Sequence, residues 1–524
     1  MDSKSSHIAG AAPEKGIVEK DLESGHDSSL DANDTRAGSV TPAYEVAKTA
    51  HIQHAIAPFR YLNQGELWLD RKLGIETQGI DRIPEDQKRP PSIWNTFLMW
   101  WSMTCHVGTI PLGVLGPEFG LTLGDSAAAI VVGTFLGAST GLRQIATSRY
   151  SFGFWGAKLC SVLNVIVGGG FAVVNVVVTG QMLSAVSDYS MTISVGCVIV
   201  AVISYVVSVF GFAMIHTFEK YSWILSFILI CVLYGQAAPH IAPDTPAPYG
   251  KDLAYAGSWL SFMSINFSSA SGWCSIAADY YCNYPANTKS SKVFFLTLAG
   301  VTLPTVFTTF AGACIGNGAL LAEYKPWNDA YEDHGLGGLL REVYHPLGWS
   351  KTCLVFLTFS VLGNNIAINY SSGLSLQLLG HYFHAIPRFI WSFLVALVVA
   401  ILAIVGKDHL STIVSNFVSL LGYWTVSFTL ILLMEDKWFR RRDAYDLEVW
   451  DKPSKLPVGA AAVLALLSGY LAGGLPGMAQ VWYVGPIAAK FGPYGGDVGV
   501  YMSAAITLLV YPILRTFEKK RFGR

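Results

Sequence analysis

Long apolar segments recur along this 524-residue chain, and they constrain its fold more than any other feature. An α-helix needs roughly 20 apolar residues to cross the bilayer's hydrocarbon core, which is about 30 Å thick, and we count about twelve such segments. Their approximate centres are Met103, Val132, Val173, Val200, Ile228, Ile265, Phe307, Leu362, Val395, Val418, Leu466 and Ala505. The segments lack the alternation of barrel strands, so the chain is predicted to be an all-α polytopic membrane protein.

Composition supports this fold class and narrows the function. Hydrophobic residues make up 52% of the chain and charged residues only 14%, which is unlike a soluble domain. The net charge of −1 gives no reason to expect a nucleic-acid partner. The eight cysteines form no CxxC pair, so neither a zinc site nor a disulfide framework is predicted. We therefore expect the lipid bilayer as partner, and neither a metal nor a cofactor.

Lysine and arginine predict the orientation. If the N-terminus is cytoplasmic, most of them fall in the inside loops and at the C-terminus. The outside loops then carry only Lys251, Lys325, Arg341, Lys351, Lys407 and Lys490. Basic loops remain on the cytoplasmic side, so both termini are predicted there. Residues 1–93 are polar, and we expect a largely disordered cytoplasmic tail.

Two of the predicted spans contain residues that interrupt helices. Span one carries Gly108, Pro111 and Gly113 in its middle, and span six contains Phe267–Ser275, in which five of nine residues are Ser or Gly. Proline removes a backbone donor and glycine loosens the backbone, so we expect both helices to break. Two interrupted spans at corresponding positions of two halves indicate a transporter's midplane substrate site. The alternative is that the small residues only let helices pack closely.

Aromatic and amide residues lie near these breaks. Trp273 follows Gly272, which leaves space beside its ring, so we expect Trp273 to form one wall of a slot for a flat heterocycle. In span three, Phe171 and Asn175 are four residues apart and share a helix face.

Span eight repeats this spacing. Asn365 and Asn369 are likewise four residues apart there. A side-chain amide offers a donor and an acceptor, and an aromatic face stacks on a heterocycle, so the set suits a small planar molecule with ring donors and acceptors. The alternative is that these asparagines hold helices together.

Short motifs spread over most of the chain match one transporter family. They are Gly74–Pro84, Leu112–Pro117, Arg149–Gly153, His216–Tyr221, Trp273 with Ala278–Tyr280, Asn364–Asn365 and Tyr370–Ser375. At these residues the chain resembles the purine-cytosine permease branch of the fungal nucleobase-cation-symport-1 family. The resemblance implies proton-coupled uptake of cytosine and of the purines adenine, guanine and hypoxanthine at the plasma membrane, with the proton as coupling ion.

The resemblance also implies a leucine-transporter-like fold of two inverted five-helix repeats. These would occupy residues 94–236 and 253–434, followed by a cytoplasmic loop at 435–455, helices eleven and twelve at 456–517, and a cytoplasmic C-terminus at 518–524. Helices one and six would be broken. The substrate-binding residues carried over are Trp273, Phe171, Asn175, Asn364, Asn365 and the hydroxyl of Thr109.

Three positions depart from the family pattern. Family members commonly carry Trp in place of Phe171, Pro in place of Ala367 and a further Asn in place of Ile368. Losing one amide removes a contact worth about 0.5 to 1.5 kcal/mol. Asn369 is adjacent but projects about 100° further round the helix. The substrate therefore stays open, and pyridoxine, known in this broader permease group, is the alternative.

Two further questions concern catalysis and coupling. A membrane enzyme needs a nucleophile, base and orienting group or a metal cluster. His106, Glu118 and Asp279 are scattered and no HExxH is present, so we expect no enzyme; a non-transporting sensor is a remote alternative. Ionisable residues within spans are candidates for proton coupling. Asp279, Glu219 and Glu118 qualify, with a structural role as cap or loop partner as the alternative for each.

Overall fold

The computed structural model describes most of the chain from residue 92 onward. The described residues are 92–139, 146–209, 212–248, 250–281, 284–285, 287–441, 445–446, 449 and 452–524, with the isolated residues Tyr61, Trp68, Lys72, Lys88 and Pro90. The tail predicted over residues 1–93 and the motif at 74–84 lie almost entirely outside this part. The side chain of Glu219 also lies outside it.

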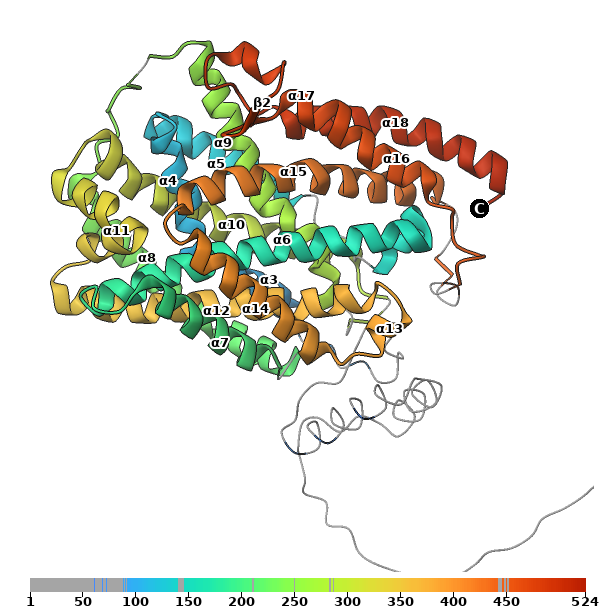
Figure 1. The fold of residues 1–524 in the computed structure, drawn as a ribbon, viewed down its shortest axis with the longest axis horizontal. Helices are drawn as coiled ribbons and strands as arrows, with labels where there is room; N and C mark the ends of the chain where they lie inside the picture. Colours follow the sequence, from blue (N-terminus) through green and yellow to red (C-terminus); the bar gives the residue numbers. More distant parts are fainter. Residues whose placement is uncertain are drawn as a thin grey trace, which may run out of the picture.

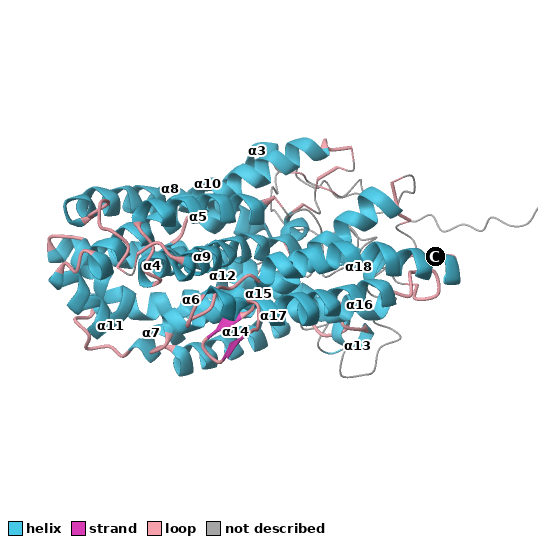
Figure 2. Cartoon of the chain, turned by 90° about the horizontal axis from the view of Figure 1, so that it is seen from above, coloured by secondary structure: helices cyan, strands magenta, loops and turns pink. Residues whose placement is uncertain are grey.

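The described chain is helical apart from one small hairpin (Figures 1 and 2). Its first part contains α3 (Ile93–Thr104), η2 (Val107–Thr109), α4 (Ile110–Glu118), α5 (Leu123–Ala138), η3 (Ala146–Ser148), α6 (Arg149–Val186), α7 (Ile193–Val209), α8 (Phe212–Ala237), η4 (Ala238–His240), α9 (Leu253–Ser271), η5 (Gly272–Ser275) and η6 (Ala277–Tyr280). Its second part contains α10 (Ser290–Gly316), η7 (Asn317–Leu321), α11 (Lys325–Val343), α12 (Leu347–Gln377), α13 (His381–His384), α14 (Arg388–Gly406), α15 (Leu410–Met434), η8 (Glu435–Phe439), α16 (Ala460–Ser468), η9 (Gly469–Gly474), α17 (Leu475–Gly477), β1 (Ala479–Gln480), β2 (Tyr483–Val484), η10 (Ala488–Phe491) and α18 (Gly499–Phe522).

Every predicted span centre lies in one of these helices. Within the described residues, eight helices are long and apolar enough to cross a membrane, and α5 and α7 are shorter apolar helices. The two remaining predicted spans are the interrupted ones. Span one comprises α3, η2 and α4, and span six comprises α9, η5 and η6. Spans two to five are α5, α6, α7 and α8; spans seven to ten are α10, α12, α14 and α15; span eleven is α16 with η9 and α17, and span twelve is α18.

The packing of spans one to ten repeats itself. Span one packs on span seven as span six packs on span two, and span three packs on span four as span eight packs on span nine. Exchanging the first five spans for the second five turns each of these pairs into the other. An odd number of crossings starts the second repeat on the opposite side of the membrane. This is the five-plus-five inverted repeat predicted from the sequence.

The last two spans lie outside this repeat. Figure 1 shows α16 and α18 along α15, on the edge of the bundle opposite α7 and α14. Helix α18 continues to Phe522, beyond the boundary predicted at residue 517. The reason is local, because Arg515 pairs with Glu518 one turn later at 3.1 Å and with Glu435 of η8 at 2.8 Å. These buried partners favour an unbroken helix.

The break in span one begins earlier than predicted. Helix α3 ends at Thr104, and Cys105 and His106 have non-helical backbone angles. Pro111 is not at the break but in the first turn of α4, where a missing N–H is tolerated. Gly113 lies inside α4, and a Cβ there would come within 1.8 Å of the Thr309 carbonyl oxygen of α10. Gly113 therefore permits close packing of α4 on α10, which was the alternative interpretation of the small residues.

The break in span six begins where it was predicted. Helix α9 ends at Ser271, and the chain continues as the short 3₁₀ turns η5 and η6. Thus a second α-helical half is absent from this span within the described residues up to Tyr281. Asp252 begins α9, because its side chain accepts a hydrogen bond from the backbone N–H of Tyr255 at 2.9 Å.

Candidate functional site

A cavity of about 50 Å³ lies between the two breaks. Spans one, three, six, seven and eight contribute its walls. The lining residues are Thr104, His106, Gly108, Thr109, Leu112, Asn164, Val167, Gly168, Phe171, Asn175, Ser269, Gly272, Trp273, Ile276, Thr305, Asn364, Ile368, Ser371 and Ser372. Six of the eight residues predicted to bind substrate are therefore brought together here, and Asn365 and Asn369 are not among them.

Trp273 is held by an aromatic cluster. Its ring meets that of Trp100 edge to face, with centroids 5.4 Å apart and planes at 76°. Trp100 is fully buried in α3, meets Tyr280 at 5.8 Å and donates its Nε1–H to the Tyr281 hydroxyl. Edge-to-face pairs of this kind contribute about 0.5 to 1.5 kcal/mol beyond burial. Span one therefore fixes the position of the tryptophan that span six supplies.

Phe171 provides a second aromatic surface. A Cβ added at Gly272 would lie 3.0 Å from the Phe171 ring, so this glycine leaves room for that ring. Phe417 of α15 contacts the Phe171 ring edge to face at 6.2 Å. In the described part of the chain, Phe171 and Trp273 make no ring contact with each other, although both line the cavity.

The cavity amides are hydrogen-bonded to one another. Asn175 Nδ2 donates to Asn364 Oδ1 and to Asn365 Oδ1, both at 2.9 Å. Asn364 Nδ2 donates to the Met103 carbonyl oxygen at 2.7 Å, beside the break in span one. Asn365 is therefore a partner of Asn175 behind the cavity wall. Spans one, three and eight are joined at this point.

Helix periodicity explains which residues of span eight face the cavity. The lining positions 364, 368, 371 and 372 follow the i, i+4, i+7, i+8 pattern of one helix face. Positions 365 and 369 share a neighbouring face about 100° further round. The predicted pairing of Asn365 with Asn369 therefore selected a face that does not line the cavity. Ile368, where the family pattern has a further Asn, lies on the lining face. Asn369 accepts a hydrogen bond from Ser392 Oγ through its backbone oxygen at 3.2 Å.

The backbone freed by the span-one break is satisfied locally. The N–H of Val107 donates to Ser360 Oγ of α12 at 3.3 Å, and the N–H of Gly108 donates to His106 Nδ1 at 3.1 Å. The Thr109 hydroxyl lies 2.9 Å from the His106 carbonyl oxygen and 2.6 Å from Thr308 Oγ1. Buried backbone at membrane depth needs such partners because lipid offers none.

The site residues predicted from the sequence omit two nitrogen-bearing side chains of the cavity, His106 and Asn164. His106 lines it, and the signal was present, because an ionisable residue lies next to the predicted break. Asn164 also lines the cavity, donates to Ser375 Oγ at 2.8 Å and accepts from Ser275 Oγ. It lies two helical turns before Phe171 on the same face of α6, which periodicity could have identified.

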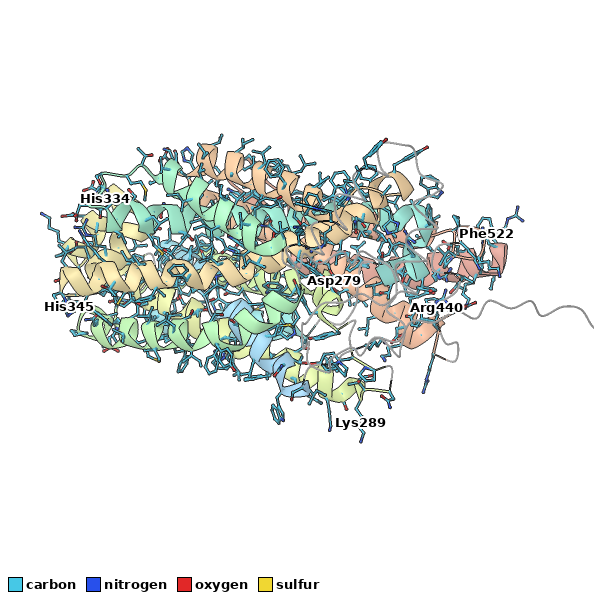
Figure 3. All side chains as sticks on the ribbon, turned by 90° about the horizontal axis from the view of Figure 1, so that it is seen from below. Asp279, Lys289, His334, His345, Arg440 and Phe522 are labelled. Atoms are coloured by element: carbon cyan, nitrogen blue, oxygen red, sulfur yellow. The ribbon has the colours of Figure 1, made fainter. Side chains whose placement is uncertain are left out.

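Two candidates for proton coupling, Asp279 and Glu118, do not line this cavity. Asp279 is half-buried in η6, and Figure 3 shows it between His334 and His345 in one half of the bundle and Lys289, Arg440 and Phe522 in the other. Glu219 has no described side chain. Glu118, at the end of α4, accepts a hydrogen bond from Ser411 Oγ at 2.5 Å and lines a separate cavity of about 570 Å³.

Solved structures share this fold. A closed, bromovinylhydantoin-bound structure of Mhp1, a nucleobase-cation-symport-1 transporter, matches 83% of this chain and 94% of its own with a TM-score of 0.61 and 13% identity. A Na⁺-coupled sialic acid symporter matches with a TM-score of 0.55 and 11% identity over 90% of this chain and 98% of its own. At these identities the likeness concerns the fold, which is leucine-transporter-like.

Sequence relatives cover most of the chain. The vitamin B6 transporter of Saccharomyces cerevisiae is 32% identical over 87% of this chain and 90% of its own length. A purine-cytosine permease of Emericella nidulans is 35% identical over 87% and 91%, and one of Saccharomyces cerevisiae is 33% identical over 86% and 88%. The family model for permeases of cytosine and purines, uracil, thiamine and allantoin matches residues 82–489. The chain belongs to this purine-cytosine permease family, and it is a membrane transporter rather than an enzyme.

Proposed function

We propose that this permease is a plasma-membrane proton symporter for cytosine and the purines adenine, guanine and hypoxanthine. The observation that carries the proposal is the cavity between the two breaks, which combines Trp273 and Phe171 with the amides of Asn175 and Asn364. The aromatic faces suit a planar ring. The amide oxygens suit ring and exocyclic N–H groups, which nucleobases carry.

The energetics permit useful affinity. A ligand of about eight heavy atoms has a ceiling near −12 kcal/mol, and micromolar binding needs only about −8 kcal/mol. One stacking contact of about 1 to 3 kcal/mol and a few hydrogen bonds are therefore sufficient. The volume also favours a small ligand, because about 50 Å³ is room for only a few water molecules. A free heterocycle is closer to this size than a nucleoside is.

Pyridoxine is the second candidate. The cavity has an apolar Ile368 on the span-eight face, and three of its hydroxyls, those of Ser269, Thr305 and Ser372, have no hydrogen-bond partner within the described chain. Pyridoxine carries several hydroxyl groups that could bond to them. One of the relatives named above is a vitamin B6 transporter, which supports testing this substrate in parallel with cytosine.

The two candidates are separated by uptake in a yeast strain that lacks its own permeases. We expect saturable uptake of labelled cytosine that unlabelled adenine and hypoxanthine reduce. Absence of competition by cytosine at millimolar concentration, together with saturable pyridoxine uptake, would replace the first candidate by the second. Binding of both ligands without flux into proteoliposomes would instead favour a sensor.

Proton coupling is tested with an imposed pH gradient in proteoliposomes. We expect an inward proton gradient to drive uptake, and Asp279→Asn to abolish this dependence while substrate binding is retained. Unchanged gradient dependence in Asp279→Asn would remove this residue from the coupling path. Glu219 is another candidate for proton coupling, and Glu219→Gln is the second variant in the same assay.

Orientation is tested with reporter fusions. Lys289 and Arg440, in the same half of the bundle, belong to loops that are predicted to be cytoplasmic (Figure 3). We expect reporters at both termini and in the loop at 435–455 to report the cytoplasm. A reporter in that loop that reports the exterior would contradict the proposed topology.

A further inference from the structure

We propose that His106 is a specificity-determining residue that donates a hydrogen bond from Nε2 to an acceptor atom of the bound heterocycle. The inference rests on the proposed function, since it names a substrate contact of the same cavity. His106 is 3% exposed and lines the cavity at the break in span one. It precedes the turn η2, whose backbone it caps.

The hydrogen bond to Gly108 fixes the tautomer of a neutral ring. Gly108 N–H donates to His106 Nδ1 at 3.1 Å, so Nδ1 has no proton and Nε2 carries it. Nε2 has no hydrogen-bond partner among the described residues. In the described part of the chain, the fully enclosed side-chain atoms that have no partner do not include Nε2. Because Nε2 also has no partner, it is not fully enclosed, and protein atoms do not seal it off. The cavity is the open space that this ring lines.

The other side-chain nitrogens of the cavity show why this donor matters. The amide nitrogens of Asn164, Asn175 and Asn364 each donate to a protein oxygen. The lining nitrogens without such a partner, within the described residues, are His106 Nε2 and Trp273 Nε1. Asn164 and Asn364 each keep a second amide N–H, whereas a ring N–H donor for a carbonyl oxygen or an unprotonated ring nitrogen of the heterocycle is found at these two places. Trp273 belongs to the stacking wall, which leaves His106 as the donor of the span-one break.

Close packing against the turn η2 and the amide of Asn175 holds His106 in a fixed position. A Cβ added at Gly108 would lie 2.8 Å from the His106 ring and 2.0 Å from Asn175 Oδ1, so the ring, the turn and the amide are in tight contact. A rigid donor discriminates strongly, because a ligand without a matching acceptor leaves the buried N–H unpaired. The break in span one thereby selects among heterocycles that stack equally well on Trp273.

Two substitutions separate substrate contact from capping. His106→Asn keeps a side-chain acceptor close to the position of Nδ1, and asparagine is a preferred N-cap residue, but it has no group at the position of Nε2. His106→Gln can place an amide N–H near the position of Nε2 and loses the short-range cap. We expect KM to rise roughly three- to tenfold in His106→Asn, with protein abundance and maximal rate unchanged, and to stay near the original value in His106→Gln.

The experiment measures uptake kinetics of cytosine, adenine, hypoxanthine and pyridoxine by the full chain, with surface abundance measured in parallel. Analogues that each lack one ring acceptor are then compared in the original protein and in His106→Asn. One analogue should bind more weakly than its parent compound to the original protein, but equally well to His106→Asn. The atom that this analogue lacks is the acceptor.

Three results would overturn the inference. An unchanged KM in a well-expressed His106→Asn would overturn it while leaving the proposed function intact. A loss in His106→Gln with no loss in His106→Asn would show that His106 only caps the turn. Absence of uptake of every heterocycle by the original protein would overturn the proposed function and, with it, this inference.

Discussion

The two broken spans are equivalent in the fold but differ in chemistry. The break in span one is short and polar, and it resumes as the regular helix α4 after a turn capped by His106 and Ser360. The break in span six continues as 3₁₀ turns and presents the large ring of Trp273, which Trp100 of span one supports. One break supplies directional hydrogen bonds and the other supplies an apolar wall. A pseudo-symmetric scaffold thus yields an asymmetric cavity.

The difference indicates how substrate selection is divided. A stacking wall is tolerant, because every flat heterocycle has an aromatic face. A capped polar turn is selective, because its donors point in fixed directions. We therefore expect changes in span six to weaken all substrates similarly, and changes in span one to alter their order.

The largest effect is expected from adding a methyl group at the first break. In Gly108→Ala the new Cβ would lie 2.0 Å from Asn175 Oδ1, whereas in Gly272→Ala it would lie 3.0 Å from the Phe171 ring. We expect Gly108→Ala to lose most uptake and Gly272→Ala to retain a measurable part. Gly169→Ala is the control, because nothing lies within 4 Å of a Cβ there. Equal losses in both breaks would contradict the asymmetry.

The next effect concerns the stacking wall. Trp273→Ala removes a ring whose stacking is worth about 1 to 3 kcal/mol, so KM should rise roughly ten- to a hundredfold for cytosine and purines alike. Trp273→Phe retains a ring and should recover much of the affinity. Uptake kinetics in the permease-null strain measure both variants. An unaltered KM in Trp273→Ala would disprove the assignment of this wall.

A smaller effect is expected from the support behind that wall. Trp100→Phe keeps a buried ring but removes the N–H that donates to the Tyr281 hydroxyl. With a weaker edge-to-face partner, Trp273 should be less well positioned, and KM should rise roughly two- to fivefold. The rise should be absent in the Trp273→Ala background, since the supported ring is then missing. Additive effects in the double variant would show that Trp100 acts independently of Trp273.

The smallest effect concerns how α9, the first half of span six, is anchored. Asp497 lies buried between the β1–β2 hairpin and α18, and its carboxylate accepts hydrogen bonds from Tyr423 and from Gln480 Nε2 at 2.8 Å. Its backbone N–H donates to Ser261 of α9 at 2.7 Å. Burial raises the pKa of Asp497 from 3.8 to about 6.

This raised pKa predicts the direction of a pH effect. The folded protein binds the proton of Asp497 more tightly than the unfolded chain does. The resulting stability is fully present below 3.8 and is lost as the pH rises through about 6. The melting temperature in detergent should therefore fall by a few degrees between about pH 4 and about pH 7. Asp497→Asn should flatten this part of the curve, and an unchanged slope would contradict the assignment.

Much of the fold was predictable, and the limits have physical causes. The apolar segments and the interrupting glycines predicted the spans and the breaks, because bilayer thickness and backbone chemistry act locally. Pro111 was misplaced relative to the break, since proline is equally compatible with the first turn of a new helix. Gly113 was read as loosening the backbone, but its role is to let α4 approach α10. Sequence alone does not identify which neighbour requires a missing side chain.

For the candidate site, too, some features were predictable from the sequence and others depended on the tertiary structure. Residue types and spacing predicted aromatic rings and amides at one cavity, because helix periodicity fixes relative directions within each span, and the family resemblance added Asn364 and the Thr109 hydroxyl. Only the tertiary structure decided that Asn364 rather than Asn369 faces this cavity, that Asn365 lies behind it, and that His106 lines it. The physical reason is that the absolute rotation of a helix is set by what its neighbours pack against. That information resides in contacts between residues far apart in the chain.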